Sequence, residues 1–277
     1  DDPRIGPGAK AEFNSRLGRR LAGPGSVGAM AGDPRAAAID ALIGLIERQY
    51  PRDAYPRVYG ALLAIHRAQC HSLALQRRGA SPYQQDVIGL SVEKGGASVL
   101  ADAYLVDGDV NEDQASFAFG LGAYLQLADD LQDVSSDRSD GLLTVFSMTA
   151  RRWPLDPLVN RLLRLPDPLL ASDPARTESG ARVVQELLRR SSRALILGAV
   201  AENRRWFSRD YLRWLEAHAS VRLSALYRLR RRVAAQARSV MLAMQRAQVP
   251  SLAAPPSPGS LLAALDASGV RRGATPH

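Results

Sequence analysis

Apolar residues recur along most of this chain at the three- and four-residue intervals of an α-helix. Between Pro34 and Gln49, for example, Ala38, Leu42, Leu45 and Ile46 form one apolar stripe. Alternation of apolar and polar positions, which would predict strands, is hard to find. Long helices joined by short polar turns are typical of a helical bundle. The pattern therefore predicts an all-α protein folded as an antiparallel helical bundle.

Turn and capping residues divide the pattern into separate elements. The expected helices cover 34–49, 54–78, from Ser81-Pro82 through Lys94 to about Val106, from Asn111 or Glu112 to about Val134, Leu158–Leu165, about 179–203 and about 208–246. Ser followed by Pro is a favourable helix start. Residues 1–34 are expected to be mostly irregular, with one turn of helix near Phe13–Leu21. Residues 135–141 are predicted to form a polar loop.

The ends of the chain differ in composition from its centre. We expect one helical domain over residues 1–248, followed by a disordered tail over 249–277 that contains Pro250, Pro255, Pro256 and Pro258. The opening Asp1-Asp2-Pro3-Arg4 is no secretory signal and lacks a starting Met, so an N-terminal truncation is one expectation. Charge interrupts every apolar stretch before about 18 residues, which predicts no transmembrane helix.

Charge and cysteine content narrow the classes of partner. The net charge is +8, and a basic chain attracts nucleic acid, acidic membrane surfaces or phosphorylated small molecules, although the charge can also serve solubility alone. Of 36 basic residues only Lys10 and Lys94 are lysines. A cluster of arginines at 228 and 230–232 favours a solvated or membrane-surface face over a diphosphate or nucleic-acid contact. The single Cys70 excludes an internal disulfide, and we expect a cytoplasmic protein.

The most informative segment is a run of polar residues inside an otherwise apolar helix. Its members share one helix face because they recur every three or four residues: Gln126, Asp129, Asp130, Asp133 and Asp137. Like charges this close destabilise a helix unless a cation neutralises them. Carboxylates that face a cavity suit Mg²⁺, which takes one or two protein carboxylates together with water and substrate phosphates. A solvated acidic face is the alternative, but the flanking residues are apolar.

This segment resembles the second aspartate-rich motif of the trans-isoprenyl diphosphate synthases, which belong to the class I isoprenoid synthase superfamily. That motif reads Gly-x-x-(Phe/Tyr)-Gln-x-x-Asp-Asp-x-x-Asp. Four residues match it position for position: Gln126, Asp129, Asp130 and Asp133. The aromatic residue, Tyr124, is shifted by one position. The resemblance extends over residues 60–146, and the later helices match only in length and character.

Two further features carry the resemblance. Lys94, followed by Gly95-Gly96, is similar to the lysine and small residue on the preceding helix of the family. The two glycines cost about 1 kcal/mol each relative to Ala in a helix, which indicates close helix packing or room for a ligand. Asp137 is similar to the trailing aspartate of the squalene and phytoene synthase branch.

The resemblance implies an enzyme that ionises an allylic isoprenoid diphosphate in a central cavity with the help of Mg²⁺, most simply a prenyl transferase of isoprenoid or terpenoid biosynthesis. The implied catalytic residues are Asp129, Asp130 and Lys94. The implied metal ligands are Asp129, Asp130 and Asp133. The implied substrate-binding residues are Lys94, Gln126, Gln69 and Tyr124. A terpene cyclase, a squalene- or phytoene-type synthase and a non-catalytic helical partner stay open as alternatives. We expect no nucleic-acid partner and consider peripheral membrane contact and a homodimer.

The chain departs from the family in its first acidic patch. The patch is either Asp1-Asp2 cut short by the chain terminus, or it is missing or unrecognisable; the seven-residue series Asp33, Asp40 and Glu47 lies on one helix face but matches the motif weakly. Arg19-Arg20 loosely fits the arginine pair that follows this patch in the family. The Asn…Ser…Glu triad of terpene cyclases is absent because Asn203 and Ser208 have the wrong spacing. His66 and Cys70 lie one helical turn apart, but two ligands do not make a zinc site.

Overall fold

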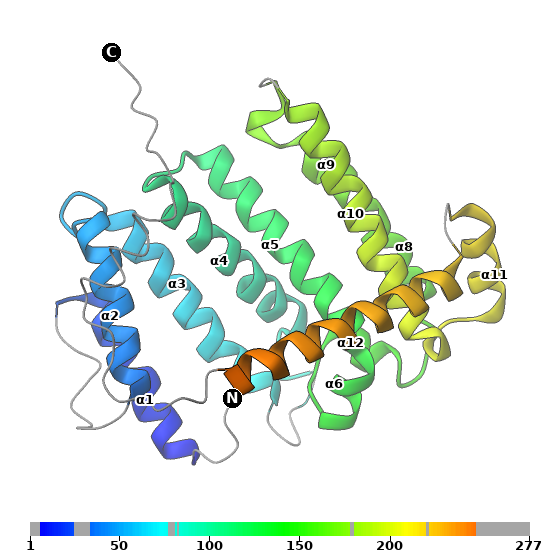
Figure 1. The fold of residues 1–277 in the computed structure, drawn as a ribbon, viewed down its shortest axis with the longest axis horizontal. Coiled ribbons are helices and arrows are strands. Elements are labelled where there is room, and N and C mark those ends of the chain that lie inside the picture. Colours follow the sequence, from blue (N-terminus) through cyan, green and yellow to red (C-terminus); the bar gives the residue numbers. More distant parts are fainter. Residues whose placement is uncertain are drawn as a thin grey trace. The chain divides into compact units, whose positions relative to one another are not determined.

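All secondary structure in the described residues is helical, which confirms the all-α prediction (Figure 1). The computed structural model describes residues 6–24, 34–76, 81, 83–177, 180–219 and 222–247. Residue contacts divide the chain into two compact units, Asp1–Tyr227 and Arg228–His277. None of the described helices is both long enough and apolar enough to cross a membrane.

The first unit holds most of the helices. These are α1 (Pro7–Ala22), α2 (Pro34–Gln49), α3 (Pro56–Ser72), α4 (Val87–Asp107), α5 (Glu112–Gln132), α6 (Val134–Asp140), α7 (Val145–Thr149), α8 (Asp156–Arg164), α9 (Pro166–Ala171), α10 (Ala181–Glu202) and α11 (Arg209–His218). Short 3₁₀ helices cover Leu73–Gln76, Pro174–Thr177 and Arg204–Trp206. Helix α12 (Leu223–Ala247) begins in the first unit and continues into the second.

Several helix boundaries differ from the sequence prediction at the N-terminal side. Helix α1 fills much of a stretch that was expected to be irregular, because Arg20 and Leu21 at its end are buried. Helix α4 begins at Val87 rather than at Ser81-Pro82. The side chain of Asp86 accepts a hydrogen bond from the backbone of Gly89 and caps this helix. By contrast, α2 has the predicted bounds, and the predicted Asn111 start of α5 is confirmed by a capping box.

The predicted loop at 135–141 and the predicted helix at 208–246 are both wrong. The polar segment forms α6 because the fully buried Val134 and the buried Asp137 anchor it to the core. The long helix is instead two helices. The hydroxyl of Ser208 caps α11, and Ala219 is extended after its end. Leu223 then starts α12 from a fully buried position. The proline-rich tail at 249–277 lies outside the described residues.

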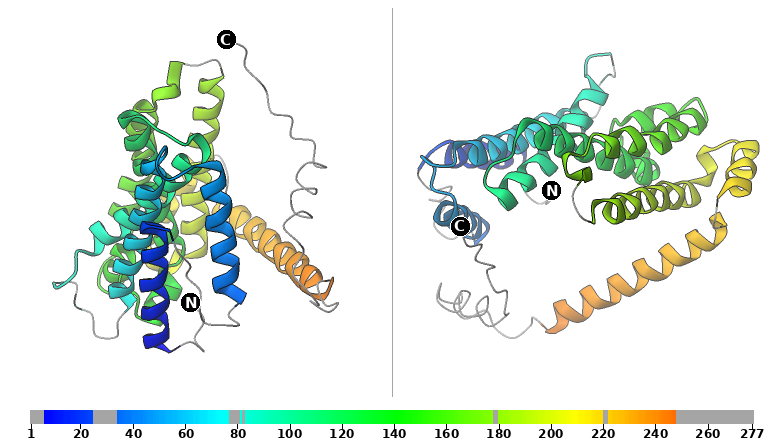
Figure 2. Two further views of the ribbon diagram at one scale, coloured as in Figure 1. Left: turned by 90° about the vertical axis from the view of Figure 1, so that its left-hand side faces the viewer. Right: turned by 90° about the horizontal axis from the view of Figure 1, so that it is seen from above.

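Helix α4 lies between α3 and α5, and α10 packs against α5 as well (Figures 1 and 2). The antiparallel contact of α4 with α5 is very close. A Cβ atom added at Gly95 would lie 2.4 Å from the carbonyl oxygen of Gly122, and one added at Gly96 would lie 2.5 Å from the ring of Phe119. Of the two explanations for the glycine pair, close helix packing is therefore confirmed. This contact also brings the polar residues of the two helices together.

Candidate functional site

Polar residues from α4 and α5 meet beside the glycine contact. Ser91 and Lys94 lie one turn apart on α4, as Gln126 and Asp130 do on α5. A Cβ atom added at Gly95 would lie 2.4 Å from the Cβ atom of Gln126, so this part of α4 lies directly against the polar face of α5. The motif residues of the two helices therefore share one side of the α4–α5 contact.

Asp130 is the most buried carboxylate of this group, with 6% of its surface exposed. The amide Nε2 of Gln126 donates a hydrogen bond to its Oδ1 atom at 2.8 Å. Its Oδ2 atom is buried and has no hydrogen-bond partner. Burial raises the pKa of Asp130, whereas Gln126, Ser91 and the charge of Lys94 lower it by smaller amounts. Burying a carboxylate with an unpartnered oxygen costs folding free energy. Groups of this kind are common in binding sites.

Asp137 extends the same acidic group beyond the end of α5. Burial and, to a smaller extent, repulsion from Asp130, Asp133 and Asp129 together raise its pKa to about 7. The hydroxyl of Thr144 donates a long hydrogen bond of 3.5 Å to its Oδ2 atom. Because the other three carboxylates act on Asp137, we call Asp129, Asp130, Asp133 and Asp137 the acidic row.

The junction between α5 and α6 is held by Asn203 and Trp206, which follow the end of α10. The side-chain amide of Asn203 donates to the carbonyl oxygens of Gln132 at 2.8 Å and Leu131 at 3.3 Å. The hydroxyl of Ser135 donates to the Asn203 side chain at 2.7 Å and accepts from the indole of Trp206 at 3.1 Å. These bonds satisfy the carbonyl groups at the end of α5 and thereby position the acidic row.

The structure brings some of the predicted site residues together and places others apart. Lys94 is half-buried near Asp130, whereas Asp129 and Asp133 are exposed. Tyr124 is buried in the apolar core, where burial raises its pKa, and α10 packs against this part of α5. Gln69 is exposed on α3, which packs against α4. The predicted roles of Tyr124 and Gln69 in substrate binding stay predictions.

Two polar side chains near the site were missed by the sequence reasoning. Ser91 stabilises the charged form of Asp130, and Thr144 contacts Asp137. Ser91 lies three residues before Lys94, so the helical period that selected the acidic row could also have selected Ser91. Nothing in the sequence relates Thr144 to Asp137, because their contact depends on the turn between α6 and α7.

On α2, Asp40 and Glu47 were candidates for the first acidic patch, and both form ion pairs with arginine. Both carboxylate oxygens of Glu47 accept hydrogen bonds from the guanidinium of Arg20 at 2.6 Å, and Arg52 adds a third bond at 2.8 Å. Asp40 lies 3.5 Å from Arg20. These hydrogen bonds lower the pKa of Glu47 to about 2, and Arg20 has the largest effect. We call Arg20, Asp40, Glu47 and Arg52 the arginine network. The other candidates for this patch, Asp1-Asp2 and Asp33, lie outside the described residues.

The other residues considered from the sequence, Asn203, Ser208, His66 and Cys70, form contacts within the protein. Asn203 binds backbone carbonyl groups as described above, and the hydroxyl of Ser208 donates to Asp156 while capping α11. The Sγ atom of Cys70 lies 3.8 Å from Nε2 of His66. Within the described part of the chain, no three His, Cys, Asp or Glu residues are grouped so that they could hold a metal ion.

No protein-family model matches this chain, and no curated protein or solved structure does either.

Proposed function

We propose that this protein is an enzyme that binds an allylic isoprenoid diphosphate beside the acidic row and ionises it, with prenyl transfer as the reaction. The observation that carries this proposal is the convergence of Lys94 and Ser91 from α4 with Gln126 and Asp130 from α5. The unpartnered Oδ2 atom of Asp130 supports a ligand that the protein alone does not supply. The motif resemblance supports the choice of substrate class.

Magnesium fits this site as an ion shared with the substrate rather than one held by protein ligands alone. No group of three ligating side chains is present in the described ranges, but Mg²⁺ needs only one or two carboxylates when substrate phosphates complete its shell. One or two of Asp129, Asp130 and Asp133 would hold it, and their oxygen atoms are the ligand type that it prefers. When bound, Mg²⁺ supplies positive charge that makes diphosphate a better leaving group.

The residues of the chain would then perform separate tasks. Lys94 would donate to a phosphate oxygen and hold the diphosphate against α4. The amide of Gln126 keeps Asp130 oriented through its 2.8 Å hydrogen bond. In the reaction the allylic C–O bond breaks and both electrons leave with the diphosphate oxygen. The double bond of an acceptor isoprenoid would attack the resulting carbocation, and loss of a proton would complete the transfer.

A non-catalytic helical partner is the second candidate, and one observation favours it. The arginine network occupies Asp40 and Glu47, so these residues do not provide the opposing patch that the family uses. A cyclase or a squalene- or phytoene-type synthase would use the same acidic row with a different fate of the carbocation.

Turnover and stability measured together test the enzymatic proposal. We expect the parent to release pyrophosphate from geranyl, farnesyl or geranylgeranyl diphosphate in the presence of Mg²⁺ and isopentenyl diphosphate. Asp129→Ala and Asp130→Ala should each lower the rate by roughly 100-fold or more, because several kcal/mol of leaving-group stabilisation is lost. Their melting temperatures should stay near that of the parent. Asp102→Asn, an exposed substitution on α4, is the control and should retain full activity.

Calorimetry separates binding from catalysis. Mg²⁺ should bind weakly alone and more tightly with pyrophosphate, because the phosphate oxygens complete its shell. Binding without any pyrophosphate release would support the non-catalytic partner. The absence of both binding and release would reject the acidic row as a functional site.

We also propose that α12 contacts an acidic membrane surface. The helix contains no Asp or Glu, and Leu229, Val233 and Val240 are each more than half exposed. A helix with arginines and a separate apolar face is typical of interfacial helices. The chain should sediment with vesicles containing phosphatidylglycerol, and Val233→Glu should reduce this. Sedimentation only with neutral vesicles, or no sedimentation at all, would contradict the proposal.

Light scattering of the protein without vesicles measures whether a homodimer forms.

A further inference from the structure

A cleft lies along α7, and Asp137, the last carboxylate of the acidic row, lines one side of it. It consists of two adjoining pockets of about 250 Å³ and about 590 Å³ that share Leu143, Met148 and Arg151. The smaller pocket is also lined by Arg138 and Ser147, and the larger one by Arg152 and Trp153. We call this hollow the α7 cleft.

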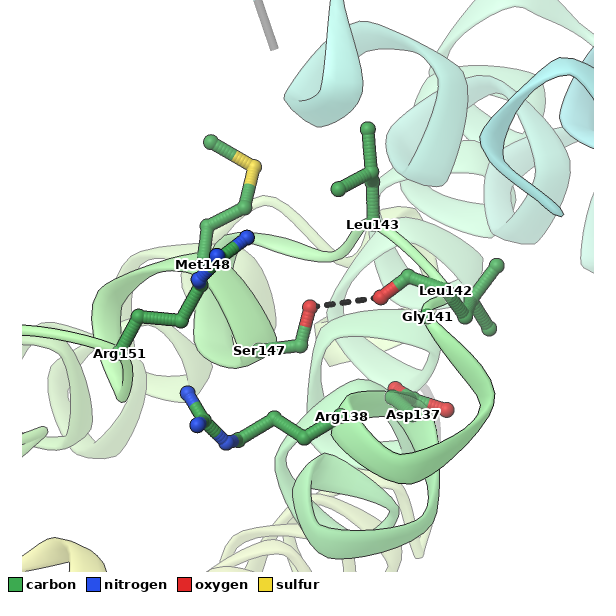
Figure 3. Close-up of a pocket in the computed structure, with 8 residues that line it drawn as sticks. All are labelled: Asp137, Arg138, Gly141, Leu142, Leu143, Ser147, Met148 and Arg151. Carbon is green, nitrogen blue, oxygen red and sulfur yellow. Dashed lines mark hydrogen bonds between the residues drawn. The ribbon is translucent and has the colours of Figure 1, made fainter. Parts of the chain in front are cut away.

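The walls of the α7 cleft are fixed by hydrogen bonds before any ligand arrives. The hydroxyl of Ser147 donates to the carbonyl oxygen of Leu142 at 2.8 Å, as Figure 3 shows, and accepts from the backbone N–H of Thr144 at 2.9 Å. The backbone N–H of Leu143 donates to the carbonyl oxygen of Leu75 at 3.1 Å. A rigid wall of this kind lowers the entropic cost of ligand binding.

The charges that line the cleft are mainly positive. In Figure 3 the guanidinium groups of Arg138 and Arg151 lie on one side of Ser147, and the carboxylate of Asp137 lies on the other. Arg138 packs over the ring of Trp206 at 4.6 Å, and its Nη1 atom is buried without a hydrogen-bond partner. Among the described residues neither arginine forms a salt bridge with a carboxylate. The guanidinium of Arg151, which is exposed, can therefore reach a ligand in the cleft.

We propose that the α7 cleft binds an organic phosphate, with the phosphate group held by Arg138 and Arg151. Guanidinium groups bind phosphate oxygens through pairs of charge-assisted hydrogen bonds. A phosphate dianion balances two or three arginines better than a carboxylate does, which favours phosphate as the anion. The apolar or aromatic body of the ligand would lie against Met148, Leu143 and the exposed ring of Trp153. This site needs no metal ion and does not depend on the proposed reaction at the acidic row.

Calorimetry with phenyl phosphate, in the presence of EDTA and with the full chain, tests this site. We expect saturable binding that phenol and benzoate do not match. Arg151→Gln should weaken the binding about tenfold, the factor that corresponds to losing one charge-assisted hydrogen bond to the phosphate. Arg151 is exposed, so its substitution should leave the melting temperature unchanged. Arg193→Gln, an exposed arginine on α10, is the matched control and should bind like the parent.

A second pair of variants separates the α7 cleft from the acidic row. Asp129→Ala should leave binding of phenyl phosphate in EDTA unchanged, whatever it does to turnover. Trp153→Ala should weaken the binding of phenyl phosphate more than that of inorganic phosphate. The proposal is overturned if binding requires Mg²⁺ and is lost in Asp129→Ala, since the anion would then lie at the acidic row. Equal losses in Arg151→Gln and Arg193→Gln, or benzoate binding as tightly as phenyl phosphate, would also overturn it.

Discussion

The arginine network and the acidic row are two polar clusters in the same helical unit, but their charges are balanced in opposite ways. In the arginine network, Glu47 receives three hydrogen bonds from two guanidinium groups, and its pKa is lowered to about 2. In the acidic row, burial and mutual repulsion raise the pKa of Asp130 and Asp137 instead. In the arginine network the carboxylates are paired with arginines of the same chain, whereas the acidic row has excess negative charge.

This difference separates a cluster that stabilises the folded chain from one that destabilises it. A carboxylate whose pKa is lowered by folding stabilises the folded state, and one whose pKa is raised destabilises it while ionised. Helices α1 and α2 therefore gain stability from Arg20 and Glu47. The acidic row costs stability that a bound cation would offset, which supports its assignment as the candidate site. Removing a carboxylate should consequently have opposite effects in the two clusters.

The largest effect is expected from breaking the helix contact that frames the acidic row. In Gly122→Ala the new Cβ atom would meet the carbonyl oxygen of Gly95 at 2.1 Å, and backbone atoms cannot easily move aside. We expect the free energy of unfolding to fall by about 3 kcal/mol or more. Gly60→Ala on α3 is the matched control, because nothing lies within 4 Å of its added Cβ atom. It should stabilise the chain by roughly 0.5–1 kcal/mol in the same denaturation experiment. Equal effects of the two substitutions would contradict the close contact.

The next effect is expected from Glu47→Gln in the arginine network. This change leaves the buried Arg20 without its bidentate partner, so unfolding should become easier by about 2–3 kcal/mol at pH 7. Because the pKa of Glu47 is lowered, its stabilisation is present above about pH 4.3 and is lost as the pH falls toward 2. Glu186→Gln, which removes two solvent-exposed ion pairs with Arg189 and Arg190, should change stability far less than Glu47→Gln does. A larger loss in the exposed pair would reverse the ranking.

A smaller effect is expected in the pH dependence of stability at the acidic row. The pKa of Asp137 is about 7 in the folded chain, compared with about 3.9 in an unfolded chain. The folded state therefore holds the proton of Asp137 more tightly than the unfolded state does. The contribution of Asp137 to the free energy of unfolding consequently declines as the pH rises from about 4 to 7. Asp137→Asn should remove this part of the slope in melting temperature measured against pH. Asp102→Asn should keep the slope of the parent, and a parent without such a slope would refute the raised pKa.

The smallest effect, and the one of opposite sign, is expected from Asp130→Asn. This substitution keeps the acceptor for Gln126 and removes a buried negative charge. Stability at pH 7 should stay unchanged or rise by up to about 1 kcal/mol, in contrast to the loss in Glu47→Gln. Urea denaturation of the two variants side by side measures this contrast. A loss of more than about 1 kcal/mol in Asp130→Asn would place the acidic row among the stabilising clusters.

Helical periodicity alone determined the fold class and much of the acidic row. The bounds of α2 and the Asn111 cap of α5 follow from local rules, and so does the shared face of Gln126 and Asp130. These features depend on residues three or four positions apart, where helix geometry alone sets the contact.

Tertiary structure decided the features that depend on distant partners. The polar segment 135–141 became α6 because Val134 and Asp137 are buried against the core, and local propensity contains no information about that burial. The break before α12 has no Gly or Pro to mark it. The ion pair of Glu47 with Arg20 joins residues 27 positions apart. Periodicity identifies which residues share a helix face, but only the packing of the helices decides whether a charge on that face meets a partner.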